Sequence, residues 1–161
     1  MTKKETIKDG LVEEFYDNGQ LSHIRNYKNG KPQDLWEGFY GNGQLAFRHT
    51  FNNGETQGLW ELFYSDGQLW SRQNFKNDEK HGLGETFYWK SNNNPLVLHG
   101  PINTRGNYKD GKKDGLNEWL YENGQLSWRG NYKNGQRHGL LGWFYDNGQL
   151  KEKKNYKNGQ R

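Results

Sequence analysis

Residues 115–135 read GLNEWLYENGQLSWRGNYKNG, and this stretch contains the features that decide the fold. It holds two Asn-Gly dipeptides, Asn123-Gly124 and Asn134-Gly135, separated by short segments rich in aromatic residues. Asn-Gly favours tight hairpin turns, because both central residues of a type I′ turn have positive φ. Aromatic residues favour strands, and no segment here shows a helical period. The stretch therefore predicts two antiparallel strands and the turns that connect them.

The same pattern recurs in six units along the chain. The Gly-Leu or Asp-Leu dipeptide that begins each unit falls at residues 10, 34, 58, 82, 115 and 139, so all spacings but one are 24 residues. The exception is 33 residues, which places a nine-residue insertion in the unit that begins at Gly82. We predict a charged N-terminal cap over residues 1–9 and one repeat domain over 10–161. Its units lie near 10–33, 34–57, 58–81, 82–114 (with the insertion at 89–101), 115–138 and 139–161.

This organisation predicts an all-β fold, namely an elongated, twisted antiparallel meander of about twelve strands with solenoid-like stacking. A two-residue turn at Asn42-Gly43 would set the register of one hairpin. The predicted pairs are Trp36 with His49, Glu37 with Arg48, Gly38 with Phe47, Phe39 with Ala46, and Tyr40 with Leu45.

Other units repeat the acid–base pair at the same position. The arithmetic pairs Glu61 with Arg72, Glu85 with Arg105 and Glu118 with Arg129, whereas Glu13 meets Ile24 and Gly142 meets Lys153 in the end units. Opposite charges directly across a strand pair contribute roughly 0.2–1 kcal/mol each. One face should therefore carry a row of glutamates and arginines, flanked by the columns that contain Leu11 and Phe15. The other should carry an aromatic column formed by Tyr27, Phe51, Phe75, Tyr108, Tyr132 and Tyr156.

The composition fits an extended repeat better than a compact sphere. Hydrophobic residues are 30% of the chain and the mean hydropathy is −1.33, values that approach those of disordered chains. The net charge of only +4 and the aromatic content of 16% argue against disorder. The absence of cysteine excludes disulfides and thiolate metal sites. Residues 1–10 lack an apolar run, so we expect neither a secretory signal nor a transmembrane segment, and a cytoplasmic location unless a signal has been removed.

The unit Gly115–Leu126, followed by Gly130–Gly135, resembles the MORN repeat, specifically the bacterial variant found in YwqK-type antitoxin-like proteins. The resemblance extends from about Asp9 to Arg161. It implies an array of β-hairpins that mediates protein contacts, and neutralisation of a toxin by binding. Some eukaryotic members are associated with dimerisation or with acidic phospholipids. The resemblance supplies no catalytic motif.

The insertion is the main break in the symmetry of the repeats, and insertions of this kind often lie on the binding side. Its apolar and amide residues are candidate partner contacts: Trp89, Asn93, Leu96, Val97 and Leu98. The alternative is a tolerated surface loop. Among the other tryptophans, Trp70 and Trp128 are the better surface candidates, because neither position is aromatic in most units. Trp36, Trp60, Trp119 and Trp143 fit mutual packing, although they could also stack on sugars.

Lysines recur in the Lys-Asn-Gly turns and would form a basic edge of the sheet: Lys28, Lys76, Lys109, Lys133 and Lys157. Such an edge could meet acidic lipid, nucleic acid or an acidic protein, but charged turns also simply keep a sheet soluble. Asp17, Asp66, Glu122 and Asp146 would make the opposite edge acidic.

No catalytic, cofactor or metal motif stands out in the sequence. The five histidines lack metal-ligand spacing, and each glutamate of the predicted row has an arginine partner, which argues against a role as general acid. We therefore expect no enzyme and no cofactor. The predicted function is a protein-binding scaffold, such as an antitoxin, immunity protein or inhibitor that occludes a toxin or effector. A homodimer is possible, and a module that binds glycan or acidic membrane surfaces is the alternative.

Overall fold

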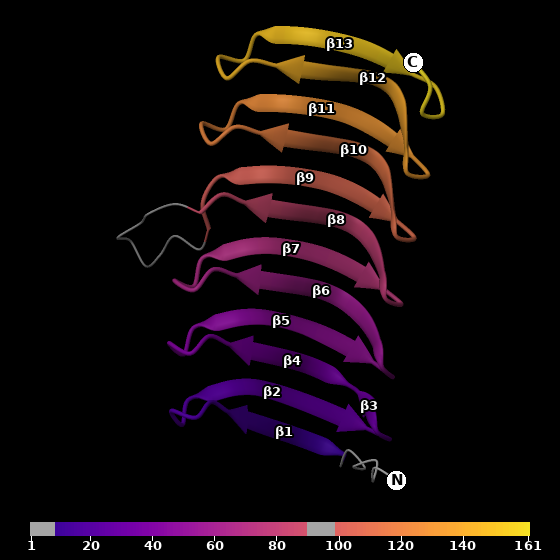
Figure 1. Ribbon diagram of the computed structural model, residues 1–161. Helices are drawn as coiled ribbons and strands as arrows, with labels where there is room; N and C mark the ends of the chain where they lie inside the picture. Colours follow the sequence, from indigo (N-terminus) through magenta and orange to yellow (C-terminus); the bar gives the residue numbers. More distant parts are fainter. Residues whose placement is uncertain (1–8, 90–98) are drawn as a thin grey trace, which may run out of the picture.

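The computed structural model describes residues 9–89 and 99–161, and every regular element in these ranges is a β-strand. Thirteen strands form one antiparallel sheet in which strands adjacent in the chain lie side by side, except that β3 and β4 both pair with β2 (Figure 1). The strands are β1 (Gly10–Phe15), β2 (Leu21–Lys28), β3 (Lys31–Pro32), β4 (Asp34–Phe39), β5 (Leu45–Asn52), β6 (Glu55–Phe63), β7 (Leu69–Lys76), β8 (Glu79–Phe87), β9 (Ile102–Lys109), β10 (Lys112–Leu120), β11 (Leu126–Lys133), β12 (Gln136–Phe144) and β13 (Leu150–Tyr156).

The hairpins stack in one sheet, as the sequence predicts, and the structure adds that this sheet is open rather than closed on itself. Figure 1 shows every strand arched in the same sense, with β1 and β13 at opposite ends of the stack. Few apolar side chains are fully covered, because one sheet without a second layer has no central core. The buried apolar residues among those described are Leu69, Phe87, Trp128 and Leu141.

The number of strands differs from the expected twelve because the second unit begins with a break. Elsewhere the segment after the Lys-Asn-Gly turn is one strand, but here β3 ends at Pro32 and β4 begins at Asp34. Proline has no amide hydrogen to donate to the ladder. Asp34 has φ 57°, where other units have a glycine with positive φ, as at Gly58 with φ 73°. The backbone is therefore irregular at this position in every unit.

The Lys-Asn-Gly turns have the predicted type I′ conformation. Asn29 and Gly30 both have positive φ, 53° and 68°, and the corresponding pairs in later units repeat this pattern. The other turns differ from the prediction. At Asn42-Gly43 only Gly43 has positive φ, and the Tyr40 amide donates to the Gln44 carbonyl at 2.8 Å. The loop therefore has three residues rather than two.

A β-bulge restores the predicted register a few residues beyond this turn. Phe39 lies opposite Leu45, so the predicted pairs of Phe39 with Ala46 and Tyr40 with Leu45 are wrong. Ala46 is the extra residue of the bulge, and beyond it Glu37 pairs with Arg48 as predicted. The longer loop takes Gly41 from the first strand and the bulge adds Ala46 to the second strand, so the two shifts cancel.

Hydrogen bonds from tyrosine link each unit to the next. The hydroxyl groups of five tyrosines donate to backbone carbonyls at the same position of the following unit. We call these bonds the tyrosine links: Tyr16 to Phe39 (2.5 Å), Tyr40 to Phe63 (2.6 Å), Tyr64 to Phe87 (3.1 Å), Tyr88 to Leu120 (2.9 Å) and Tyr121 to Phe144 (3.0 Å). Because they repeat, they fix the position of one hairpin on the next.

Candidate functional site

The Glu–Arg row crosses the whole sheet on one face, which we call the ladder face. Paired residues continue from strand to strand, and the confirmed pairs include Glu61 with Arg72 and Glu85 with Arg105. In order the row is Glu13, Ile24, Glu37, Arg48, Glu61, Arg72, Glu85, Arg105, Glu118, Arg129, Gly142 and Lys153. Acid and base alternate from Glu37 to Arg129, and over the whole row the positive and negative residues are equal in number.

The shortest ion pairs of this row join neighbouring units rather than the two strands of one hairpin. Arg72 approaches Glu85 with Nη2 at 2.5 Å and Nε at 2.6 Å, and Arg105 Nε lies 2.5 Å from Glu118. Arg48 bonds Glu61 in the same way. Within a hairpin, Arg129 is 3.9 Å from Glu118. The carboxylates are buried, whereas the arginine side chains remain 43–50% exposed.

A row of leucines runs beside the Glu–Arg row on the ladder face. The leucine row consists of the Leu of each Gly-Leu or Asp-Leu dipeptide: Leu11, Leu35, Leu59, Leu83, Leu116 and Leu140. Its members, apart from the half-buried Leu116, are 40–65% exposed. Each lies opposite a polar residue, as Leu59 lies opposite Asn74 and Leu83 opposite Asn107. Exposed leucines that recur at the same position of successive units, with a polar residue between each two, can together mark a contact surface.

The opposite side, which we call the aromatic face, carries rings in its first half. His49 lies among Phe47, Phe51 and Trp60, with ring centroids 5.5, 4.6 and 4.5 Å away. Both ring nitrogens of His49 are buried without a hydrogen-bond partner among the described residues. Burial lowers the pKa of His49, because desolvation disfavours the charged imidazolium.

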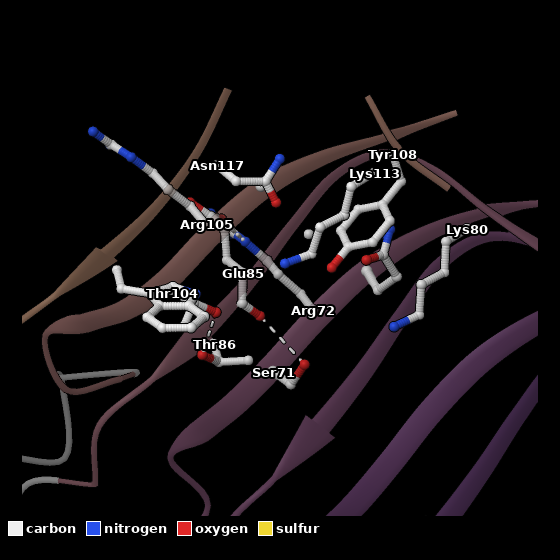
Figure 2. Close-up of a pocket in the computed structure, with 14 residues that line it drawn as sticks. Ser71, Arg72, Lys80, Glu85, Thr86, Thr104, Arg105, Tyr108, Lys113 and Asn117 are labelled. Atoms are coloured by element: carbon white, nitrogen blue, oxygen red, sulfur yellow. Dashed lines mark hydrogen bonds and ion pairs between the residues drawn. The ribbon is translucent and has the colours of Figure 1, made fainter. Parts of the chain in front are cut away.

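A shallow hollow of about 100 Å³ interrupts the rings in the middle of the sheet, over β7–β10. Figure 2 shows Ser71, Thr86 and Thr104 toward one end of it and Lys80, Tyr108 and Lys113 toward the other. The Thr86 and Thr104 hydroxyl groups are 2.7 Å apart and hydrogen-bonded.

Glycines at the floor of the hollow leave room for polar side chains. The amides of Gln73 and Asn117 occupy the space that a Cβ would take at Gly84 and Gly106. Trp119, which is 51% exposed, lies at the rim.

The predicted binding residues do not form one cluster. Trp89 is 54% exposed, and its indole Nε1 donates to Asp66 Oδ2 at 2.6 Å. Asn93, Leu96, Val97 and Leu98 lie outside the described residues. Trp70 is 46% exposed, beside the Tyr64 ring. The placement of Trp128 on the surface is wrong: it is 4% exposed, with the rings of Trp119 and Tyr132 beside it.

The predicted basic edge is present but mixed in charge. Lys28, Lys76, Lys109, Lys133 and Lys157 are all exposed at the type I′ turns. Acidic residues lie at the same edge: Glu55, Asp78, Glu79 and Asp110. His81 Nδ1 is 3.7 Å from Asp110 there, and nowhere in residues 9–89 or 99–161 do three potential metal ligands gather. The same two ranges contain no helix that could cross a bilayer.

Sequence reasoning missed two features of these surfaces. The sequence places the leucine of the repeated dipeptide beside the Glu–Arg row, but it does not show that this leucine row is exposed, because apolar residues at repeated strand positions usually face a core. Trp119 was assigned to packing although its strand position is aromatic in few units. The small residues at Gly84 and Gly106, which open the hollow beside it, are the signal that could have identified it.

Comparison with known proteins agrees with the hairpin architecture. The family model described as the MORN repeat variant matches residues 8–29, 35–53, 56–77, 113–135 and 137–158. The unmatched part includes the unit with the insertion. Among curated proteins, none matches this chain. MORN repeats are non-catalytic binding repeats, and the matched residues cover more than half of the sequence. The chain therefore belongs to the MORN repeat variant family.

Proposed function

We propose that this chain is a non-catalytic scaffold that binds another protein through the leucine row and neutralises it by occlusion, as an antitoxin, immunity protein or inhibitor does. The exposed leucine row carries the proposal. Leucines two strands apart are spaced by about 9–10 Å, so six of them span about 50 Å. A row of this length offers many shallow apolar contacts and suits a protein surface better than a small molecule.

The charges beside the leucine row favour a protein over acidic lipid or nucleic acid. The Glu–Arg row alternates in sign, so this face presents no net positive field that would attract a polyanion. The half-exposed guanidinium groups of Arg48, Arg72 and Arg105 can still orient a partner through hydrogen bonds. Because hydrogen bonds hold the sheet in one arrangement, little ordering entropy is lost on binding.

The test is site-specific photo-crosslinking in the native host. A photoreactive residue replaces Leu59 in one variant and Trp119, on the aromatic face, in the other. We expect a crosslinked partner from position 59 and none from position 119. A partner captured only from position 119 would contradict the assignment of the ladder face.

Mutation then tests affinity and neutralisation. Leu59→Asp with Leu83→Asp should weaken binding of the identified partner at least about tenfold, since each lost apolar contact is worth on the order of 1–2 kcal/mol. The same pair should abolish any rescue of growth when the partner is toxic. Trp89→Ala is the matched control, and a comparable loss in that variant would instead place the contact at the insertion.

A glycan-binding module is the second candidate function, and the hollow on the aromatic face favours it. Trp119 is a half-exposed platform beside the Asn117 amide and the Thr104 hydroxyl, a combination that suits the apolar face and the hydroxyl groups of a sugar. Binding of cell-wall glycans that is lost in Trp119→Ala but retained in Leu59→Asp would support this function. Binding to vesicles of acidic phospholipid is tested in parallel. Binding to these vesicles that depends on Lys80 and Lys113 would instead indicate recognition of a membrane surface.

A further inference from the structure

Each end strand of the sheet has one edge that no strand of the described residues pairs with. Within residues 9–89 and 99–161, β1 pairs with β2 alone and β13 with β12 alone. A strand with an unpaired edge is a template for strand addition, which lysines usually discourage. At one end of the sheet, β13 carries such lysines at positions 151, 153 and 154. At the other end, β1 carries Glu13 and Glu14 instead.

The Glu–Arg row ends in opposite charges at these two edges. Three of the five internal junctions align a base of one unit with an acid of the next: Arg48 with Glu61, Arg72 with Glu85 and Arg105 with Glu118. At the other two, Ile24 meets Glu37 and Arg129 meets Gly142. At the last strand the base position is Lys153, and at the first strand the acid position is Glu13. If β13 of one copy joined β1 of another in the internal register, Lys153 would lie directly opposite Glu13.

The tyrosine links end in the same complementary way. Tyr145 occupies the position of the five linking tyrosines, but its hydroxyl makes no hydrogen bond to the described part of the chain. Phe15 occupies the position of the accepting residues Phe39 and Phe63, and no tyrosine of the described ranges donates to its carbonyl. A junction in the internal register would pair the Tyr145 hydroxyl with the Phe15 carbonyl.

The apolar residues at the ends fit each other as well. Phe15 is 59% exposed and Leu150 is 52% exposed, whereas Phe87 and Leu69, at the same positions of internal units, are 1% and 6% exposed. One contact opposes the junction, because Glu14 and Glu152 would face each other. Each already has a cation on its own hairpin, since Arg25 and Lys154 each lie 2.7 Å from their glutamate.

We propose that the partner of these two edges is a second copy of this chain, joined head to tail with β13 against β1 in the register of the internal junctions. The contact is heterologous, so each added copy presents a new pair of edges and the assembly is open-ended. It uses neither the leucine row nor the hollow, and it is therefore independent of the proposed function.

Sedimentation velocity of the untagged 161-residue chain tests the proposal, with concentrations from about 1 µM to 1 mM. We expect the weight-average mass to rise steadily past that of a dimer. Glu13→Lys and Lys153→Glu should each weaken self-association at least about tenfold, because each places like charges across the junction. The double variant with both changes should recover it, and so should an equimolar mixture of the two single variants. Tyr145→Phe should weaken it about two- to tenfold.

Control variants separate this junction from other modes of association. Glu122→Lys makes the same change of charge at an exposed turn and should leave the mass profile unchanged, as should Leu59→Asp with Leu83→Asp. A chain that stays monomeric at every concentration overturns the proposal. A dimer that does not grow, or that is lost only when the leucines are changed, overturns it by placing the contact on the ladder face. Circular dichroism and thermal melts establish that each variant is folded.

Discussion

At the scale of single residues, the glycine that begins five of the six units has a positive φ, a backbone conformation that most side chains disfavour. Gly58 has φ 73°, and a Cβ at this position would meet no atom within 4 Å. We therefore expect Gly58→Ala to lower the free energy of unfolding by about 1–2 kcal/mol through backbone strain alone. Urea unfolding measures the change. Gly41→Ala is the matched control, since Gly41 has open space and no positive φ, and it should be neutral or slightly stabilising. Equal losses in the two variants would contradict the explanation.

His49 should make stability depend on pH near neutrality. Because burial lowers its pKa in the folded protein, the unfolded chain binds more protons between the folded pKa and the ordinary value of about 6.5. Stability from this group is therefore complete above the ordinary pKa and falls as the pH drops toward the folded pKa. Urea unfolding at pH 8, 7, 6 and 5.5 should show this decline. His49→Phe fits the ring cluster and should flatten it; an unchanged slope would show that another group titrates.

Some residue-level properties could not be read from the sequence. The burial of Trp128 depends on side chains of other strands, because the Trp119 ring lies beside it and Leu141 shares with it the space above Gly130. The three-residue loop at Asn42-Gly43 was missed because the same dipeptide also suits the two-residue turn, and the choice between them depends on a bulge at Ala46. Propensity rules do not contain either type of information.

At the scale of strands and hairpins, the alternation of acid and base was enough to predict the register. A one-residue slip would turn Glu61 and Arg72 to opposite faces, so their repeated spacing in several units leaves one solution. The sequence could not show which neighbour forms the shorter ion pair. That depends on the direction of each arginine side chain, which here extends toward the following unit.

Because these arginine side chains extend toward the following unit, the glutamates should contribute unequally to the free energy of unfolding. Glu85 is buried, and two nitrogen atoms of Arg72 lie within 2.6 Å of its carboxylate. Glu37 lies opposite Ile24 and makes no ion pair within the described ranges. Glu85→Gln should lower the free energy of unfolding by about 1–2 kcal/mol, discounted because the arginine is half exposed. Glu37→Gln should cost less than about 0.5 kcal/mol. Urea unfolding of both variants at low and high salt provides the comparison; equal costs would mean that contacts between units add no stability.

At the scale of the whole molecule, stability should be graded along the stack rather than uniform. Each hairpin packs only on its neighbours in the sheet, so an internal unit makes two junctions with other units and an end unit makes one. The exposed fraction at equivalent positions agrees with this gradient: Phe15 in β1 is 59% exposed and Phe87 in β8 is 1% exposed. Local opening should therefore require less free energy at the ends than in the middle.

Hydrogen exchange on the dilute monomer should resolve this gradient. We expect the amides of β1 and β13 to exchange fastest and those of β7–β10 slowest, because opening an internal unit breaks two junctions and opening an end unit breaks one. Uniform protection from β1 to β13 would mean that the stack unfolds only as a whole. At high concentration, head-to-tail pairing should slow exchange at β1 and β13 together, and Lys153→Glu should remove that protection without changing β7–β10. The same measurement thus separates the stability that a unit receives within one chain from the stability that a second copy adds at its edges.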